Sequence, residues 1–212
     1  MVDSRELRTI PSTNRTTDTC IPRSGSYLTP NWVSLMRRLL LLRHAKTERH
    51  APGGSDRDRR LTARGKNDAT EVGAWLVREL SLLPDLVLIS TAVRARETWD
   101  IIRKMFPDEM AQRLTEHLPE LYGAEPMQLL TIIHSVGPDP ERLMIVGHNP
   151  GLHELALRLI GSGDAAGRAA LADNLPTSGL AVIDFAVDRW HSITFGGGRL
   201  ARYVSPKLLK ES

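Results

Sequence analysis

The sequence predicts an α/β protein with three layers, in which helices cover both faces of a mostly parallel central sheet. Three short apolar runs, at residues 39–42, 86–89 and 143–146, are each bounded by charged or turn-forming residues. Uninterrupted runs of this kind are typical of strands that are buried on both faces. Between the runs, apolar residues recur at spacings of three and four, as they do in amphipathic helices. This alternation of strand and helix patterns favours a parallel sheet with crossover helices.

The remaining elements follow from caps, prolines and periodicity. We expect helices at about 64–80 after Thr62, at 93–106 up to Pro107, from Pro126, and from Pro150 to Gly161. Residues 116–121 are a short edge strand, since Pro119 would remove a hydrogen-bond donor from a central one. Residues 161–176 are expected to be a small, partly helical surface excursion. Residues 180–187 and 191–195 are expected to pair as a hairpin, with a last strand at 200–204.

Composition excludes several classes of protein. The chain has 212 residues, 41% hydrophobic and 25% charged, which are ordinary globular values. A net charge of +3 and an aromatic content of 5% give no support for nucleic acid as a partner. No apolar segment approaches 18 residues, so we expect no membrane span. Cys20 is the only cysteine, which excludes disulfide frameworks and favours a cytoplasmic location.

The first 35 residues differ from the rest. They are rich in Ser, Thr and Pro and have no apolar periodicity. We expect residues 1–35 to be a disordered N-terminal extension and residues 36–212 to be a single folded domain. Met36 stands directly before the first strand, so we expect Met36 to be the true start and the preceding residues to be a mis-assigned extension.

Chemically active side chains follow two of the buried strands. Arg43 and His44 end the first strand, and His148 follows the third. Because parallel strands bring their carboxyl ends to one edge of a sheet, the two imidazoles are expected to share a pocket. Arg94 lies in the first turn of the helix after the second strand, where backbone N–H groups also favour anions. Such a site suits a phosphoryl group, with a histidine nucleophile and arginine forks on the oxygens.

The same residues carry a family resemblance. Arg43-His44-Ala45, Ser90-x-x-x-Arg94-Ala95-x-x-Thr98 and Gly147-His148-Asn149 resemble the three sequence blocks of the histidine phosphatase superfamily, in the same order. More narrowly, Leu40 to Lys46, Asp58 to Gly65, Val146 to Pro150 and Thr177 to Gly179 resemble the small SixA-type phosphohistidine phosphatases. The resemblance covers about residues 36–209 and implies the phosphoglycerate mutase-like fold.

The resemblance also implies roles. His44 is the nucleophile that forms a phosphohistidine intermediate, and Arg43, Arg94 and His148 complete the phosphate pocket without a metal or other cofactor. Thr47 and Asn149 are further candidate substrate ligands. Glu120 is the candidate general acid, although SixA-type enzymes depend little on this group and a phosphohistidine substrate does not require it.

The sequence leaves open the roles of some other polar residues. Asp58 is a candidate for holding an arginine, and Arg59 or Arg60 for touching substrate. Thr177-Ser178 is a candidate for orienting the second nitrogen of the nucleophile. His153-Glu154 lacks the second histidine of a metalloprotease motif, which disfavours zinc.

We therefore expect a monomeric, metal-independent phosphatase whose substrate is phosphohistidine in proteins. The segment between Arg94 and His148, about fifty residues long, leaves little chain for a lid. An uncovered pocket suits a side chain that protrudes from a protein. One alternative is a phosphomonoesterase on a small sugar- or nucleotide-like phosphate. A second, from another class, is a phospho-ligand binding module without turnover.

Overall fold

The computed structural model describes residues 36–51, 53–107 and 114–211. The chain divides into residues 1–31 and residues 32–212, and every described residue belongs to the second unit. The expectations of a disordered segment at 1–35 and of a start at Met36 concern a part of the chain outside the described residues, apart from Met36 itself.

A sheet of seven strands forms the centre of the described structure. Its order is β3-β2-β4-β1-β6-β7-β5. Neighbours are parallel from β3 to β1 and between β5 and β7, whereas β6 is antiparallel to both β1 and β7. The strand bounds are β1 Arg37–Arg43, β2 Leu86–Ser90, β3 Leu114–Leu118, β4 Arg142–Gly147, β5 Ile160–Gly163, β6 Leu180–Phe185 and β7 Gly198–Val204. The mostly parallel α/β sheet and the edge position of β3 are confirmed.

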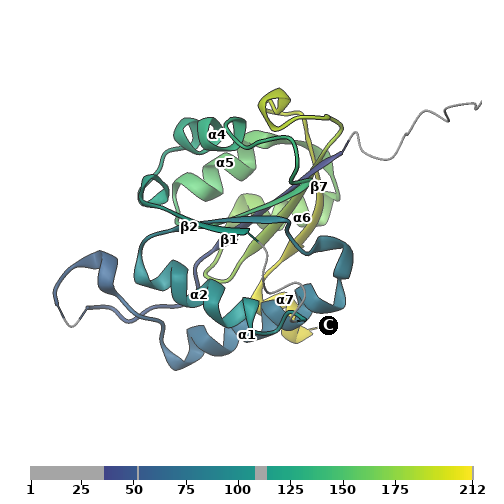
Figure 1. Cartoon of the computed structure of the whole chain (residues 1–212). Helices are drawn as coiled ribbons and strands as arrows, with labels where there is room; N and C mark the ends of the chain where they lie inside the picture. The colour runs from purple at the N-terminus through teal and green to yellow at the C-terminus, as the bar shows by residue number, and fades with distance from the viewer. Residues whose placement is uncertain (1–35, 52, 108–113, 212) are drawn as a thin grey trace, which may run out of the picture. The chain divides into compact units, whose positions relative to one another are not determined.

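Helices cover both faces of this sheet (Figure 1). The helix bounds are α1 Ala63–Arg78, α2 Val93–Arg103, α4 Pro126–His134, α5 Gly151–Leu159, α6 Ala165–Asp173 and α7 Pro206–Glu211. Side chains of α1 and α2 share one hydrophobic core with the sheet, and side chains of α4, α5 and α6 share the other. The three-layer arrangement expected from the sequence is thus confirmed.

The central position of β1 in the sheet explains why residues 39–42 are all leucine. Successive side chains of a strand point to opposite faces. Leu40 and Leu42 therefore pack into the core with α1 and α2, while Leu39 and Leu41 pack into the core with α4 and α5. All four are completely buried. A central strand with two buried faces has no position for a polar side chain until it ends.

The expected hairpin strand at 191–195 is wrong. Trp190–Ser192 forms a short 3-10 turn, and β7 at Gly198–Val204 is the antiparallel partner of β6. Trp190 and Ile193 are buried in the core with α4 and α5, so their apolar character comes from that packing rather than from a strand. The segment 161–176 is also more regular than expected, since β5 and α6 occupy it and Leu171 is buried.

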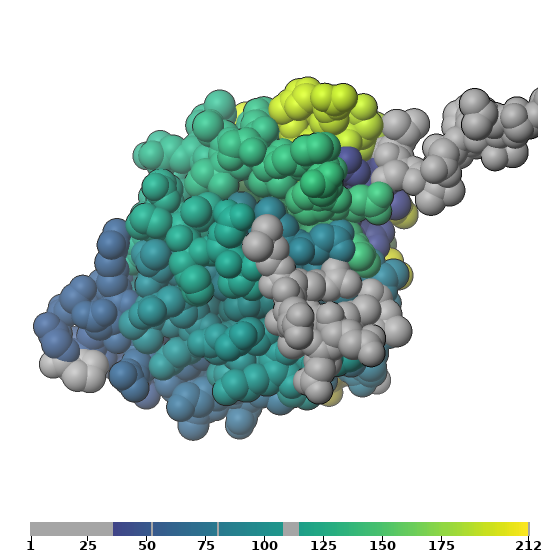
Figure 2. Space-filling view, in the orientation of Figure 1, coloured from purple at the N-terminus to yellow at the C-terminus, as the bar shows by residue number. Residues whose placement is uncertain are grey.

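Three parallel strands end at the same edge of the sheet. Arg43 of β1 pairs with Gly147 of β4, and Val146 of β4 pairs with Ile89 of β2. The loop between β1 and α1, blue in Figures 1 and 2, projects from this edge. The residues that follow the three strands are thereby brought together, as the sequence predicts.

Candidate active site

His44 leaves β1 in a fixed orientation. Its backbone N–H donates to the carbonyl of Gly147 at 3.1 Å, and the residue is only 8% exposed. The Nδ1 atom lies 2.8 Å from the carbonyl oxygen of Ala45. Because a carbonyl can only accept, Nδ1 carries the proton and donates it. The lone pair of the neutral ring is therefore on Nε2, as a nucleophile requires.

His148 lies beside His44. The two ring centroids are 5.1 Å apart, and Nε2 of His148 is 2.7 Å from the hydroxyl oxygen of Ser90 at the end of β2. Nδ1 of His148 is buried and has no hydrogen-bond partner among the described residues. The two imidazoles thus lie side by side, as the strand order predicts.

Both imidazoles are held in the neutral form. Burial lowers the pKa of His44 to about 4, and the positive charges of Arg94 and Arg43 act in the same direction, against the hydrogen bond to Ala45. Burial lowers the pKa of His148 to about 3, and His44 and Arg94 add to this shift. Desolvation and nearby positive charge both disfavour an imidazolium, so neither ring is protonated at neutral pH.

Two arginines flank the histidines with donors to spare. Nη1 of Arg43 donates to the carbonyl of Leu175 at 2.9 Å, and Arg94, 6% exposed, donates through Nη1 and Nη2 to Asp56. The Nε atoms of Arg43 and Arg94 are buried without a hydrogen-bond partner in the described part of the chain. Unpaired buried donors are costly. An anion bound here would satisfy them with charge-assisted hydrogen bonds.

The segment that follows α6 holds the main chain at Arg43 and His44. Ser178 has a φ of 58°, and its N–H lies 3.2 Å from the carbonyl oxygens of both Arg43 and His44. The expectation that Thr177-Ser178 orients the second nitrogen of His44 is wrong, because the carbonyl of Ala45 does so. On the other side, the N–H of Ala45 donates to the hydroxyl of Thr98, which donates to the carbonyl of Arg94.

A carboxylate that the sequence did not single out joins the site. Asp56 accepts from Nη2 of Arg94 at 2.9 Å, from Nη1 of Arg59 at 2.9 Å and from the hydroxyl of Tyr122 at 2.8 Å. The Tyr122 ring meets His148 edge to face, with centroids 5.5 Å apart. Asp58, the acid that the sequence favoured as an arginine partner, is exposed and makes no side-chain contact of this kind among the described residues.

The other three candidates from the sequence, Thr47, Asn149 and Glu120, differ in their surroundings. The buried hydroxyl of Thr47 accepts from Nη2 of Arg59 at 2.6 Å, and Asn149 donates to the carbonyl of Leu175, which Arg43 also binds. Glu120 is exposed in the turn Pro119–Leu121. It lines a shallow hollow with Tyr122 and Gln128 and has no described contact with either histidine.

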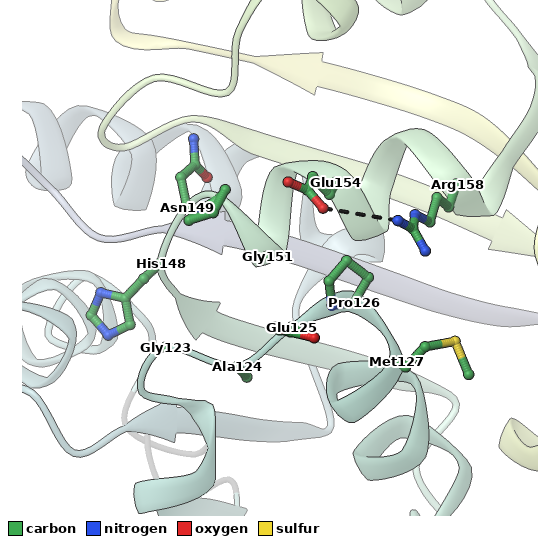
Figure 3. A pocket seen from close by; sticks show the side chains of 11 residues that line it. Gly123, Ala124, Glu125, Pro126, Met127, His148, Asn149, Gly151, Glu154 and Arg158 are labelled. Atoms are coloured by element: carbon green, nitrogen blue, oxygen red, sulfur yellow. Dashed lines mark ion pairs between the residues drawn. The ribbon is translucent and has the colours of Figure 1, made fainter.

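A cavity of about 400 Å³ opens next to His148 (Figure 3). Its walls come from the turn into α4 and from the first turns of α5, with the Glu154–Arg158 ion pair at the end away from His148. The lining residues are Gly123, Ala124, Glu125, Pro126, Met127, His148, Asn149, Pro150, Gly151, Glu154 and Arg158. This volume holds a small organic group.

No group of three or more His, Cys, Asp or Glu side chains in the described residues is arranged to hold a metal ion. None of the described helices is long and apolar enough to cross a membrane.

Known proteins are similar to this chain in sequence and in fold. Residues 39–131 match the family model described as the histidine phosphatase superfamily, branch 1. An uncharacterised protein of Mycobacterium tuberculosis is 36% identical over 168 residues, which cover 78% of this chain and all of that protein.

Solved structures agree. A candidate phosphohistidine phosphatase SixA from Agrobacterium tumefaciens is 32% identical, with a TM-score of 0.66 over 80% of this chain and 98% of that chain. A second such protein, from Nakamurella multipartitia, is 25% identical, with a TM-score of 0.64 over 81% of this chain and 96% of that chain.

Proposed function

The chain belongs to the histidine phosphatase superfamily, and we propose that it is a metal-independent phosphatase that removes the phosphoryl group from phosphohistidine in proteins. The observation that carries the proposal is the pairing of His44 with His148 near Arg43 and Arg94, whose Nε donors are buried and have no partner among the described residues. SixA proteins among the structural neighbours support the choice of substrate.

In the first step, the Nε2 lone pair of His44 attacks phosphorus, and the bond from phosphorus to the substrate nitrogen breaks. Arg43, Arg94 and His148 donate to the phosphoryl oxygens, whose charge spreads in the transition state. The carbonyl of Ala45 stabilises the positive charge that the ring gains, because it accepts from Nδ1–H. The product is phosphorylated His44.

In the second step, water attacks the same phosphorus. The bond to Nε2 breaks, inorganic phosphate leaves, and His44 recovers its lone pair. The substrate imidazole already carries a proton on its other ring nitrogen, so the break of the P–N bond in the first step releases it as a neutral ring without help from a further acid. This fits the exposed position of Glu120, which has no described contact with either histidine, and we assign Glu120 no essential part.

The space around the site favours a substrate that protrudes from a larger molecule. The cavity next to His148 is open and is lined by short turns and by side chains of α5. Thr47 and Asn149 already bind protein groups and act as supports of the pocket rather than as direct ligands in this proposal. A monomer in the cytoplasm remains our expectation.

A comparison of substrates tests the function. The purified chain is offered a phosphohistidine peptide, p-nitrophenyl phosphate and a set of sugar and nucleotide phosphates, and kcat/KM is measured for each. We expect the highest value for the phosphohistidine peptide. A preference for a sugar or nucleotide phosphate would contradict the choice of substrate, and binding of phosphate without turnover of any compound would identify a binding module.

A further inference from the structure

We propose that Asp56 is the positioning residue for Arg94: it holds one edge of the guanidinium so that the other edge faces the phosphoryl group. The proposal rests on the proposed function, since it assigns Asp56 to the same reaction. Asp56 lies on the loop between β1 and α1, 38 residues before its arginine partner.

Asp56 grips Arg94 at two points. Its carbonyl oxygen accepts from Nη1 at 2.7 Å, and its carboxylate oxygen Oδ2 accepts from Nη2 at 2.9 Å. A guanidinium has five N–H donors in a rigid, planar fork. Two terminal donors are therefore engaged, while Nε–H is buried and unpaired among the described residues. The edge formed by Nε–H and the second proton of Nη2 is left for an anion.

The same carboxylate connects the parts of the site. Oδ1 binds Arg59, whose other nitrogens donate to the carbonyl of Glu48 and to the hydroxyl of Thr47, just past the nucleophile. Oδ2 also accepts from Tyr122, whose ring contacts His148. Asp56 thus ties the loop after His44, the first turn of α2 and the turn before α4 to one point.

Its charge suits this role. The hydrogen bonds from Arg59 and Tyr122, together with the charge of Arg94, hold the pKa of Asp56 well below its usual range. The carboxylate stays ionised at any physiological pH, so it cannot donate a proton to a leaving group. What it supplies is a fixed acceptor, and a preorganised arginine stabilises the transition state without reorganisation.

The test distinguishes an Asp56 that positions Arg94 from an Asp56 that only competes with the substrate for Arg94. We compare Asp56→Ala with Asp58→Ala, a matched control two residues further in the same turn, which lacks the contacts. Vanadate mimics the five-coordinate phosphoryl group, whereas inorganic phosphate resembles the ground state. For Asp56→Ala we expect kcat to fall at least about tenfold and the Kd of vanadate to rise by a similar factor, with the Kd of phosphate changed less than about threefold. Asp58→Ala should change none of these values.

Coupling to Arg94 provides the second readout. In an Arg94→Lys background, which lacks the fork, Asp56→Ala should lower kcat less than about threefold, because residues that act through each other are not additive. Additive losses, or an unchanged Kd of vanadate in Asp56→Ala, would overturn the proposal. Tighter binding of both anions with undiminished kcat would show that Asp56 competes with substrate instead.

Two controls keep the outcome readable. Asp56→Asn preserves the shape of the side chain and is measured in the same way if Asp56→Ala fails to fold. Vanadate binding needs no turnover, so the role of Asp56 is tested even if the chain hydrolyses none of the substrates. In that event the proposed function fails, and the positioning of Arg94 is judged by vanadate alone.

Discussion

The tautomer of His44 decides whether this residue can act as a nucleophile. The carbonyl of Ala45 fixes the proton on Nδ1 and leaves the lone pair on Nε2. His44→Ala removes that lone pair but no part of the two hydrophobic cores. We expect kcat to fall at least about a thousandfold while the melting temperature stays within a few degrees. Activity within tenfold of the wild type would contradict covalent catalysis by His44.

The low pKa of His44 predicts how activity depends on pH. Attack requires the unprotonated ring, and burial with the neighbouring arginines lowers its pKa to about 4. The acid limb of kcat/KM should therefore lie near pH 4 rather than near 6.5, where a solvent-exposed histidine titrates. The profile is measured with p-nitrophenyl phosphate and corrected for the ionisation of that ester. An acid limb at pH 6 to 7 would show that the free enzyme does not hold His44 in this environment.

The sequence could predict the main site residues but not their support. Arg43, His44 and His148 follow buried strands, and Arg94 starts the next helix, so their meeting depends only on parallel strand order. Asp56 lies in the loop between β1 and α1, and a loop sequence has no periodicity from which its contact with Arg94 could be predicted. Two acids and three arginines stand together at residues 56–60, and only the three-dimensional path of the loop shows that Asp56, rather than Asp58, contacts Arg94.

At the level of elements, Gly65 in the first turn of α1 sets how closely this helix approaches the segment that follows His44. A Cβ atom on Gly65 would lie 2.0 Å from the carbonyl oxygen of Lys46, which accepts from the N–H of Thr62. Gly65→Ala must push α1 away from this loop, and overpacking of this kind costs about 1–3 kcal/mol. We expect a lower free energy of unfolding in urea and a lower kcat.

Gly53→Ala is the matched control, since nothing lies within 4 Å of the position of its Cβ atom. It should leave both the free energy of unfolding and kcat close to the wild-type values. If the two variants behave alike, the close approach of Gly65 to Lys46 has no structural importance.

The errors in the expected elements have a common physical cause. Periodicity reports whether a side chain is buried, not what it is buried against. Ile193 is buried because its segment folds over the core with α4 and α5, yet the apolar pattern of that segment resembles a strand. The β6 partner begins instead at Gly198, where a Cβ would lie 2.6 Å from Ile183 and so only glycine fits.

At the scale of the whole molecule, the fold brings the candidate site residues together at one edge of the sheet. Strands β2, β4 and β1 have apolar interiors, so their polar side chains lie at the strand ends. There, two histidines are buried in the neutral form next to arginines. In the proposed function this arrangement would stabilise a bound anion, and it should also make the free protein sensitive to acid.

The free energy of unfolding should therefore decrease as the pH is lowered, in a range set by the pKa values of these two histidines. In the folded chain their pKa values are about 4 and about 3, against 6.5 for an ordinary histidine. Between pH 6.5 and pH 4 the unfolded chain binds protons that the folded chain does not, so acid favours unfolding. Each histidine should lower the free energy of unfolding by up to about 2 kcal/mol between pH 7 and pH 5. Urea unfolding in phosphate-free buffer measures this loss, because bound phosphate would mask it.

The double variant His44→Gln/His148→Gln lacks both imidazoles and should lose less stability over the same range, while all other titrating groups remain common to both proteins. Equal losses for the two proteins would mean that the imidazoles are not buried as neutral groups.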